Sequence, residues 1–256
     1  MIESTTSVII VGAGPVGLAL GCELGLRGVP SMLVEKRDGS IPVPKQSMVS
    51  SRSMELCRRW GVAGAVRNAV WPESHPRDFV YVDSLRGREL LRVKLSSFAA
   101  RDRQDFTPEP PCPCPQTYFD PILMGRVKSF PSVRLRYNTR LDGFTQERDG
   151  VTAQLTEMGT GAEHTVTAYY LVGCDGPAGL VGEQLGIGVA GSSAIANSLN
   201  LFFRSVALAS FHDKGWARFY RVIDASGCWA ELIPIDGKEL WRLTVFDEPA
   251  SAQEPF

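Results

Sequence analysis

The chain has 256 residues, of which 44% are hydrophobic and 21% are charged, as in an ordinary globular protein. Its 27 basic and 28 acidic side chains nearly cancel, which argues against nucleic acid or a membrane surface as a partner. No apolar run reaches the roughly 20 residues of a membrane span, and the N-terminus has no signal-peptide pattern, so we expect a cytoplasmic protein.

The strongest signal in the sequence lies near its start. An apolar run over residues 8–11 leads into a glycine-rich turn, a helical pattern follows, and a second apolar run over 32–34 ends on an acid, Glu35. This order is the dinucleotide-binding βαβ fingerprint: a pyrophosphate lies against free N–H groups at the helix start, and the acid binds a ribose diol. The residues of the predicted turn are Gly12, Ala13, Gly14, Pro15, Val16 and Gly17.

The glycines of this segment have separate tasks. Gly12 permits the tight turn, Gly14 lets a pyrophosphate approach the backbone, and Gly17 and Gly21 let the helix lie close on the sheet. Glycines also mark ordinary turns. The complete motif, with both strands and the terminal acid, favours the nucleotide-binding interpretation.

The middle of the chain mixes helices with short strands. The patterns predict a helix over residues 52–60, ended by Gly61, strands over 79–82 and 89–93, and a long proline-rich loop over 99–115. A further helix is predicted within residues 116–130. We place its start near Asp120-Pro121, because an acid before a proline is typical of a first helical turn.

The remainder of the sequence is rich in strand patterns. Asp149-Gly150 predicts a hairpin turn, and a buried strand over residues 169–174 runs into Asp175-Gly176. After Gly188 the strands alternate and carry aromatic residues, which indicates an antiparallel sheet. The other predicted strands cover residues 133–135, 140–147, 151–157, 164–168, 200–206, 216–223, 228–235 and 240–245.

The six cysteines do not indicate a metal site or a disulfide framework. Cys22, Cys57 and Cys174 lie on apolar patterns and are expected to be small core residues. Cys112-Pro113-Cys114 has two thiols close together, but no histidine has ligand spacing around it. Two thiols in a stiff extended loop are the favoured interpretation, and we predict no metal.

Four stretches of the chain resemble the flavoprotein aromatic hydroxylases, the single-component FAD-dependent monooxygenases that include the p-hydroxybenzoate and phenol hydroxylases. Beyond the fingerprint, the resemblance rests on residues 51–56, 114–123 and 170–176. It implies that Arg52 reaches the FAD pyrophosphate, that Gln116 packs near the FAD, and that Asp175 serves FAD and nicotinamide nucleotide binding. Lys36 and Leu141 complete the predicted cofactor site.

Each of these residues also has an ordinary structural interpretation. From the sequence alone, Arg52 fits a solvated arginine at a helix end, and Gln116 fits a surface residue at a helix start. Asp175 fits a plain strand-to-helix turn. The order and spacing of the motifs together make the cofactor interpretation the stronger one.

The predicted fold class is α/β: a Rossmann-like dinucleotide-binding domain with a mixed sheet, and a β-rich second domain that is truncated at the C-terminus. We assign residues 1–80 and 101–188 to the discontinuous FAD-binding domain. Residues 81–100 and 189–256 form the incomplete β-rich domain on the substrate side.

The sequence departs from the family pattern at three places. Gly179 and Gly182 stand where the family's Asp-Gly motif continues to a serine and an arginine, and Ser47 stands where phenol-type members carry an aspartate base. A hydroxyl is no carboxylate base at neutral pH, and no catalytic base is named. The Gly-Asp dipeptide that closes the family's FAD site does not occur in the chain.

The resemblance implies an FAD-dependent monooxygenase that hydroxylates a small aromatic, phenolic substrate with NAD(P)H and O2. The alternative is a non-catalytic FAD- or ADP-binding protein, or half of a split enzyme whose partner chain supplies the C-terminal half. A homodimer is a further alternative for the assembly. An NAD-dependent dehydrogenase is weaker, because it leaves the three later motifs unexplained. Five aromatic residues are candidate pocket walls, although ordinary core is favoured for them: Phe202, Phe219, Tyr220, Trp229 and Trp241.

Overall fold

The computed structural model describes residues 2–72, 74–95, 97, 106–191 and 197–247. It divides into two compact units. The first consists of Met1–Lys45, Ser53–Val66 and Gln116–Ala190, and the second of Gln46–Arg52, Arg67–Pro115 and Gly191–Phe256. The bounds of the two units differ from the predicted ones. Three segments that the sequence assigned to the first domain group with the second unit: residues 46–52, 67–80 and 101–115.

The first unit is built on a parallel sheet with the strand order β11-β1-β2-β7. Every residue of β1 and β2 is buried, which explains why their sequences are continuous apolar runs rather than alternating ones. The predictions of both strands are confirmed. The strands are β1 (Val8–Val11), β2 (Ser31–Val34), β7 (Val133–Arg136) and β11 (Tyr170–Gly173).

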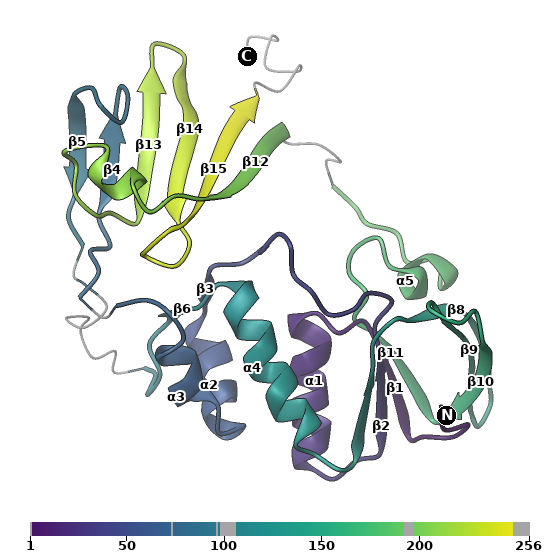
Figure 1. Cartoon of the computed structure of the whole chain (residues 1–256). Helices are drawn as coiled ribbons and strands as arrows, with labels where there is room; N and C mark the ends of the chain where they lie inside the picture. Colours follow the sequence, from purple (N-terminus) through teal and green to yellow (C-terminus); the bar gives the residue numbers. More distant parts are fainter. Residues whose placement is uncertain (1, 73, 96, 98–105, 192–196, 248–256) are drawn as a thin grey trace. The chain divides into compact units, whose positions relative to one another are not determined.

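Helices cover one face of this sheet, and a second sheet covers the other (Figure 1). Helices α1 (Pro15–Leu26) and α4 (Gln116–Lys128) pack together, and Gly21 lets them approach closely: a Cβ there would lie 3.2 Å from both Leu33 and Val127. The other layer is an antiparallel sheet of β8 (Thr139–Glu147), β9 (Gly150–Glu157) and β10 (Glu163–Ala168), with the predicted hairpin turn between β8 and β9.

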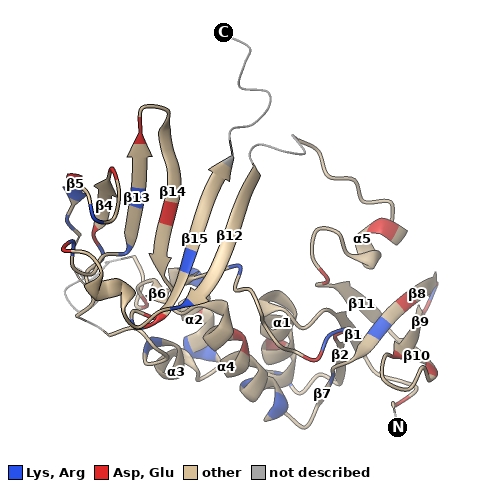
Figure 2. Cartoon of the chain, turned by 45° about the horizontal axis from the view of Figure 1, so that its top comes forward, with Lys and Arg blue, Asp and Glu red and all other residues tan. Residues whose placement is uncertain are grey.

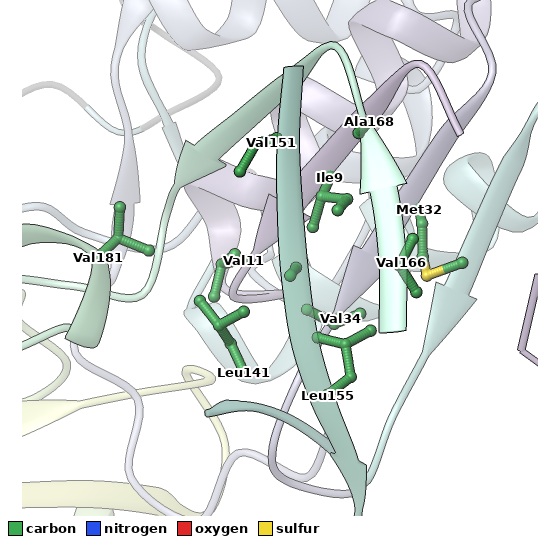
Figure 3. Close-up of a cluster of buried hydrophobic side chains, with 11 residues drawn as sticks. Ile9, Val11, Met32, Val34, Leu141, Val151, Leu155, Val166, Ala168 and Val181 are labelled. Carbon is green, nitrogen blue, oxygen red and sulfur yellow. The ribbon is translucent and has the colours of Figure 1, made fainter. Parts of the chain in front are cut away.

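A hydrophobic core fills the space between the two sheets of the first unit (Figure 3). Because side chains alternate along a strand, one set from β1 and β2 faces this core and the other set faces the helices. The buried cluster consists of Ile9, Val11, Met32, Val34, Leu141, Val151, Ala153, Leu155, Val166, Ala168 and Val181.

Helix α4 starts earlier than predicted. It begins at Gln116, so Asp120 is not its N-cap and Pro121 lies inside the helix. The Gln116 side-chain amide donates to the Asp120 carboxylate across 2.9 Å, four residues away. This i, i+4 bond supports the turn that the proline would otherwise weaken.

Strand β11 is less buried than its apolar sequence predicted. It pairs only with β1 and forms an edge of the described parallel sheet. Tyr169 and Tyr170 are therefore exposed, and Cys174, expected in the core, is half-buried. Cys22 and Cys57 are buried as expected, and so are Cys112 and Cys114.

The shorter elements connect the larger ones. Helix α2 follows the bounds expected from the sequence closely, and Gly61 after it has a φ of 77°, which suits a glycine at a helix C-terminus. The short elements are β3 (Met48–Val49), α2 (Ser51–Arg59), α3 (Ala63–Arg67), β6 (Cys112–Pro113), α5 (Leu180–Gln184) and a 3-10 turn (Leu208–Ser210).

The second unit is built on a six-stranded sheet with the order β12-β15-β14-β13-β4-β5. All neighbours pair antiparallel except β13 and β4, so the mixed pairing occurs here rather than in the parallel sheet. Tyr220 and Trp241 are buried in its core, whereas Trp229 is exposed. The strands are β4 (Phe79–Val82), β5 (Glu89–Val93), β12 (Asn197–Arg204), β13 (Phe219–Asp224), β14 (Gly227–Pro234) and β15 (Leu240–Asp247).

None of the described helices has the length and apolar character to cross a membrane. Within the same residues, no group of three or more histidine, cysteine, aspartate or glutamate side chains is arranged to hold a metal ion.

Candidate functional site

The turn after β1 has the geometry that the fingerprint requires. Gly12 has a φ of 100°, where side chains are strained, and its N–H donates to the Val34 carbonyl across 2.8 Å. A Cβ on Gly12 would lie 2.5 Å from the Cys174 carbonyl oxygen, and one on Gly17 would overlap the Gly12 carbonyl. These two glycines are therefore required by the fold of the turn itself.

Gly14 differs from its neighbours because nothing occupies the place of its missing side chain. It is the N-cap of α1, with φ −73° and ψ −177°, and no side chain caps this helix end. A Cβ on Gly14 would meet no atom within 4 Å. The open space lies at a helix N-terminus, where free N–H groups and the helix dipole favour an anion. The turn thus leaves room for a phosphate group against its backbone.

Glu35 closes the turn from the side of β2. Its carboxylate accepts one hydrogen bond from the Ala13 N–H at 3.0 Å and another from the Arg37 N–H at 2.9 Å. A carboxylate has about four acceptor sites, so two remain for the hydroxyls of a ribose. Glu35 therefore shapes the turn as well as facing it, a role that the sequence pattern did not reveal.

Gln116 lies at the start of α4 and connects two segments of the first unit. Its Oε1 accepts from the Lys45 N–H at 2.9 Å, and its Nε2 donates to Asp120 Oδ2 at 2.9 Å. Burial raises the pKa of Asp120 to about 6, against the opposing effect of the Gln116 hydrogen bond, and Asp120 Oδ1 is buried without a partner in the described residues. Asp120 was not selected from the sequence, although its i, i+4 spacing from Gln116 is a usable signal.

Asp175 follows β11 and caps the next helix. Its Oδ2 accepts the Val181 N–H of α5 at 3.1 Å. A Cβ on Gly179 would overlap this carboxylate, so a glycine at this position allows the Asp175 side chain to fold back toward α5. This cap supports the plain structural interpretation of Asp175, and its contact with a nucleotide stays a prediction.

The remaining predicted residues have different surroundings. Lys36 is exposed directly after β2, and the Leu141 side chain is buried in the core of the first unit, so a cofactor contact from Leu141 would have to come from its backbone. Arg52 is exposed in the first turn of α2 and belongs to the second unit. The roles of these three residues stay predictions.

Comparison with known proteins agrees with the geometry of the turn. The family described as "FAD binding domain" matches residues 5–256 of the chain. The chain belongs to the FAD-binding monooxygenase family. The expected α/β fold is confirmed by solved structures of this family that match the whole chain.

Three relatives indicate the range of this FAD-binding monooxygenase family. 2,4-Dichlorophenol 6-monooxygenase from Cupriavidus pinatubonensis is 31% identical over 203 residues, which cover 78% of this chain and 34% of that protein. The substrate-free rebeccamycin biosynthetic enzyme REBC has a TM-score of 0.88 and 38% identity, covering 100% of this chain and 50% of its own. Aklavinone-11 hydroxylase, solved with FAD and aklavinone, has a TM-score of 0.83 and 29% identity, covering 100% and 48%. The chain therefore spans between a third and a half of the length of these relatives.

Proposed function

We propose that this chain binds FAD through the turn after β1 and serves an FAD-dependent monooxygenase that hydroxylates an aromatic, phenolic substrate with NAD(P)H and O2. The observation that supports this most strongly is the open space at Gly14, at the uncapped start of α1. The turn would hold the pyrophosphate, and Glu35 would hold the adenosine ribose. When bound, FAD supplies the redox chemistry, and the protein supplies position and electrostatics.

The spectrum of the purified 256-residue protein tests this proposal. We expect the protein to retain FAD after unbound flavin is removed, and NADPH to bleach the flavin bands in the absence of oxygen. A protein that stays colourless after loading with FAD contradicts the proposal. Bound FAD that NADPH does not bleach supports the second candidate, a non-catalytic FAD-binding protein or one half of a split enzyme.

The second candidate is favoured by one observation. The relatives that match are two to three times as long as the matched part, so activity of the whole protein does not follow from this chain. Mixing the chain with a candidate partner and repeating the NADPH measurement distinguishes a split enzyme from a non-catalytic protein.

Two nucleotides that differ only in the 2′-hydroxyl group distinguish ribose binding by Glu35 from its structural role in the turn. We expect wild-type protein to bind ADP about tenfold more tightly than 2′-deoxy-ADP, because the deoxy compound leaves a carboxylate acceptor unpaired. Glu35→Ala should reduce this preference below about twofold, whatever it does to the turn. Isothermal titration calorimetry measures both affinities, and an unchanged preference in the variant would show that Glu35 does not bind the ribose.

A further inference from the structure

Strand β12 forms one edge of the six-stranded sheet of the second unit (Figure 1). Within the described residues it pairs only with β15, and each of its residues is exposed or half-buried. Figure 2 shows β12 uncharged over most of its length, whereas β13, β14 and β15 each have a charged band. Its sequence, NSLNLFFR, contains neither proline nor lysine, the residues that commonly protect a sheet edge from pairing with another chain. This edge is therefore a candidate interaction surface.

One face of β12 continues the hydrophobic core of the sheet. Leu199, Leu201 and Phe203 alternate along the strand and are 59%, 44% and 37% exposed. They lie opposite three apolar residues of β15, of which Trp241 is buried in the core of the unit. The apolar surface of the core thus extends past β15 and is exposed on β12. An exposed apolar strand at a sheet edge favours association with a further strand.

The opposite edge of the same sheet is better protected. Strand β5 lies between Arg88 and Lys94, so both of its ends are charged. Within it, Arg92 forms ion pairs with Glu89 and Asp78, each at 2.9 Å. Charged side chains along an edge oppose pairing with a second strand. Of the two edges, β12 is the one suited to accept a strand.

The outward-pointing hydrogen-bonding groups of β12 belong to alternate residues. The Ser205 N–H donates to the Glu239 carbonyl of the neighbouring chain segment across 2.8 Å. Since hydrogen-bonded pairs alternate along an antiparallel ladder, the odd-numbered residues of β12 are those that bond β15. The even-numbered residues therefore direct their N–H and C=O groups away from β15: Ser198, Asn200, Phe202 and Arg204.

An antiparallel pair of two copies of β12, centred on Leu201, uses all of these outward groups. Asn200 of each copy then faces Phe202 of the other, and both belong to the hydrogen-bonded set. Ser198 likewise faces Arg204, so no like charges meet. The pairing is isologous and closes at two copies, because each copy contributes the same edge.

The same register joins the two apolar faces. Leu201 lies opposite its own counterpart at a non-hydrogen-bonded position, where Cβ atoms are about 4.5–5.5 Å apart. Leu199 of each copy lies opposite Phe203 of the other, and apolar pairs of this kind stabilise a sheet. A register shifted by one residue would set the polar face of one copy beside the apolar face of the other. The backbone groups and the side chains of β12 thus favour the same arrangement.

We propose that the β12 edge is a self-association surface, on which a second copy of this chain adds its own β12 in an antiparallel pair centred on Leu201. This proposal goes beyond FAD binding and does not depend on it. The competing occupant is an extended strand of another protein. The second copy is favoured because β12 itself supplies the matching apolar side chains and backbone groups.

Sedimentation velocity of the 256-residue protein tests the assembly over a concentration range of about 2–200 µM. One strand pair buries less than the roughly 1,200 Å² of a standard interface, so we expect a reversible dimer with a dissociation constant of about 10–100 µM. A chain that stays monomeric over the whole range overturns the proposal. Open-ended assemblies also overturn it, because the pairing closes at two copies.

Two lysine variants locate the interface. Leu201→Lys places two charges opposite each other at the centre of the pair, so the dimer should weaken at least about tenfold. Leu91→Lys is the matched control, because Leu91 is 55% exposed on β5 at the other edge of the same sheet, and its dimer should stay within about twofold of wild type. Circular dichroism verifies that both variants are folded. A dimer that Leu201→Lys does not weaken, or that only Leu91→Lys weakens, overturns the β12 site.

Two cysteine variants test the register, in a Cys228→Ser background because Cys228 is exposed. Leu201→Cys should give a disulfide-linked dimer when copper-phenanthroline and O2 oxidise the two facing thiols. Leu199→Cys lies on the same face and is the control. Its two copies are four residues apart along the pair, about 13 Å, which is too far for a disulfide. Absence of linked dimer from Leu201→Cys, or an equal yield from both variants, overturns the proposed pairing.

Discussion

Gly14→Val is expected to abolish FAD binding without unfolding the protein. The Gly14 backbone, at φ −73° and ψ −177°, is open to any residue, and a Cβ there meets nothing within 4 Å. The only structural penalty is a poorer N-cap, about 1 kcal/mol. A branched side chain would fill the space that we propose for the phosphates. Losing two or more charge-assisted hydrogen bonds implies at least a hundredfold weaker binding, about 3 kcal/mol.

Flavin fluorescence titration and a thermal melt measure the two sides of this prediction. Gly12→Val is the contrasting variant, because Gly12 has a φ of 100° and its Cβ would lie 2.5 Å from the Cys174 carbonyl oxygen. We expect that change to destabilise the protein by more than about 3 kcal/mol. If Gly14→Val bound FAD with wild-type affinity, the pyrophosphate would not lie at this turn.

The difference between these two glycines shows what the sequence could predict and what it could not. The fingerprint identified Gly12, Gly14 and Gly17 together, since its spacing is a local property of the chain. Only the structure separates them: Gly12 and Gly17 are required by backbone packing, and Gly14 alone borders open space. A motif shows that glycine is needed at a position. The physical reason for that need depends on atoms from distant parts of the chain, such as the Cys174 carbonyl.

The same limit applies to the strands and helices. The strands β1, β2, β4 and β5 and the β8–β9 hairpin were predictable, because apolar periodicity and turn residues are local signals. The edge position of β11 was not, since burial of a strand depends on how many neighbours it pairs with. The parallel pairing of β4 with β13 joins residues about 140 positions apart, such as Tyr81 and Arg221, and no local pattern encodes it.

Asp175 and Asp120 show that the structural role of an acid depends on its partners in the fold. Asp175 was selected by its motif, and the structure gives it a helix cap made possible by Gly179. Asp120 was predicted only as a helix start. In the structure it is buried and accepts a hydrogen bond from the Gln116 side chain. In both cases the sequence identified a polar residue correctly and the partner decided its role.

The burial of Asp120 makes the stability of the protein depend on pH in an unusual direction. Desolvation raises its pKa from 3.8 to about 6, because little compensates the buried charge beyond the Gln116 amide. The folded state therefore binds more protons than the unfolded state between these two values. The contribution of this group is most favourable below the unfolded pKa and is lost as the pH rises through the folded pKa. Fully developed, the loss is about 3 kcal/mol.

Asp120→Asn should remove this dependence. The amide stays neutral and can still accept from Gln116, so we expect the variant to match wild type near pH 4 and to be more stable by about 1–3 kcal/mol above pH 7. Urea denaturation of both proteins across this range measures the difference. Asp38→Asn is the control: Asp38 is exposed, and its hydrogen bonds to Ser40 lower its pKa, so its removal should not flatten the loss of stability on going from acid to neutral pH. Parallel pH curves for wild type and Asp120→Asn would show that the Asp120 carboxyl is hydrated or paired with a cation in solution, and would remove the physical basis for treating Gln116 and Asp120 as a buried pair.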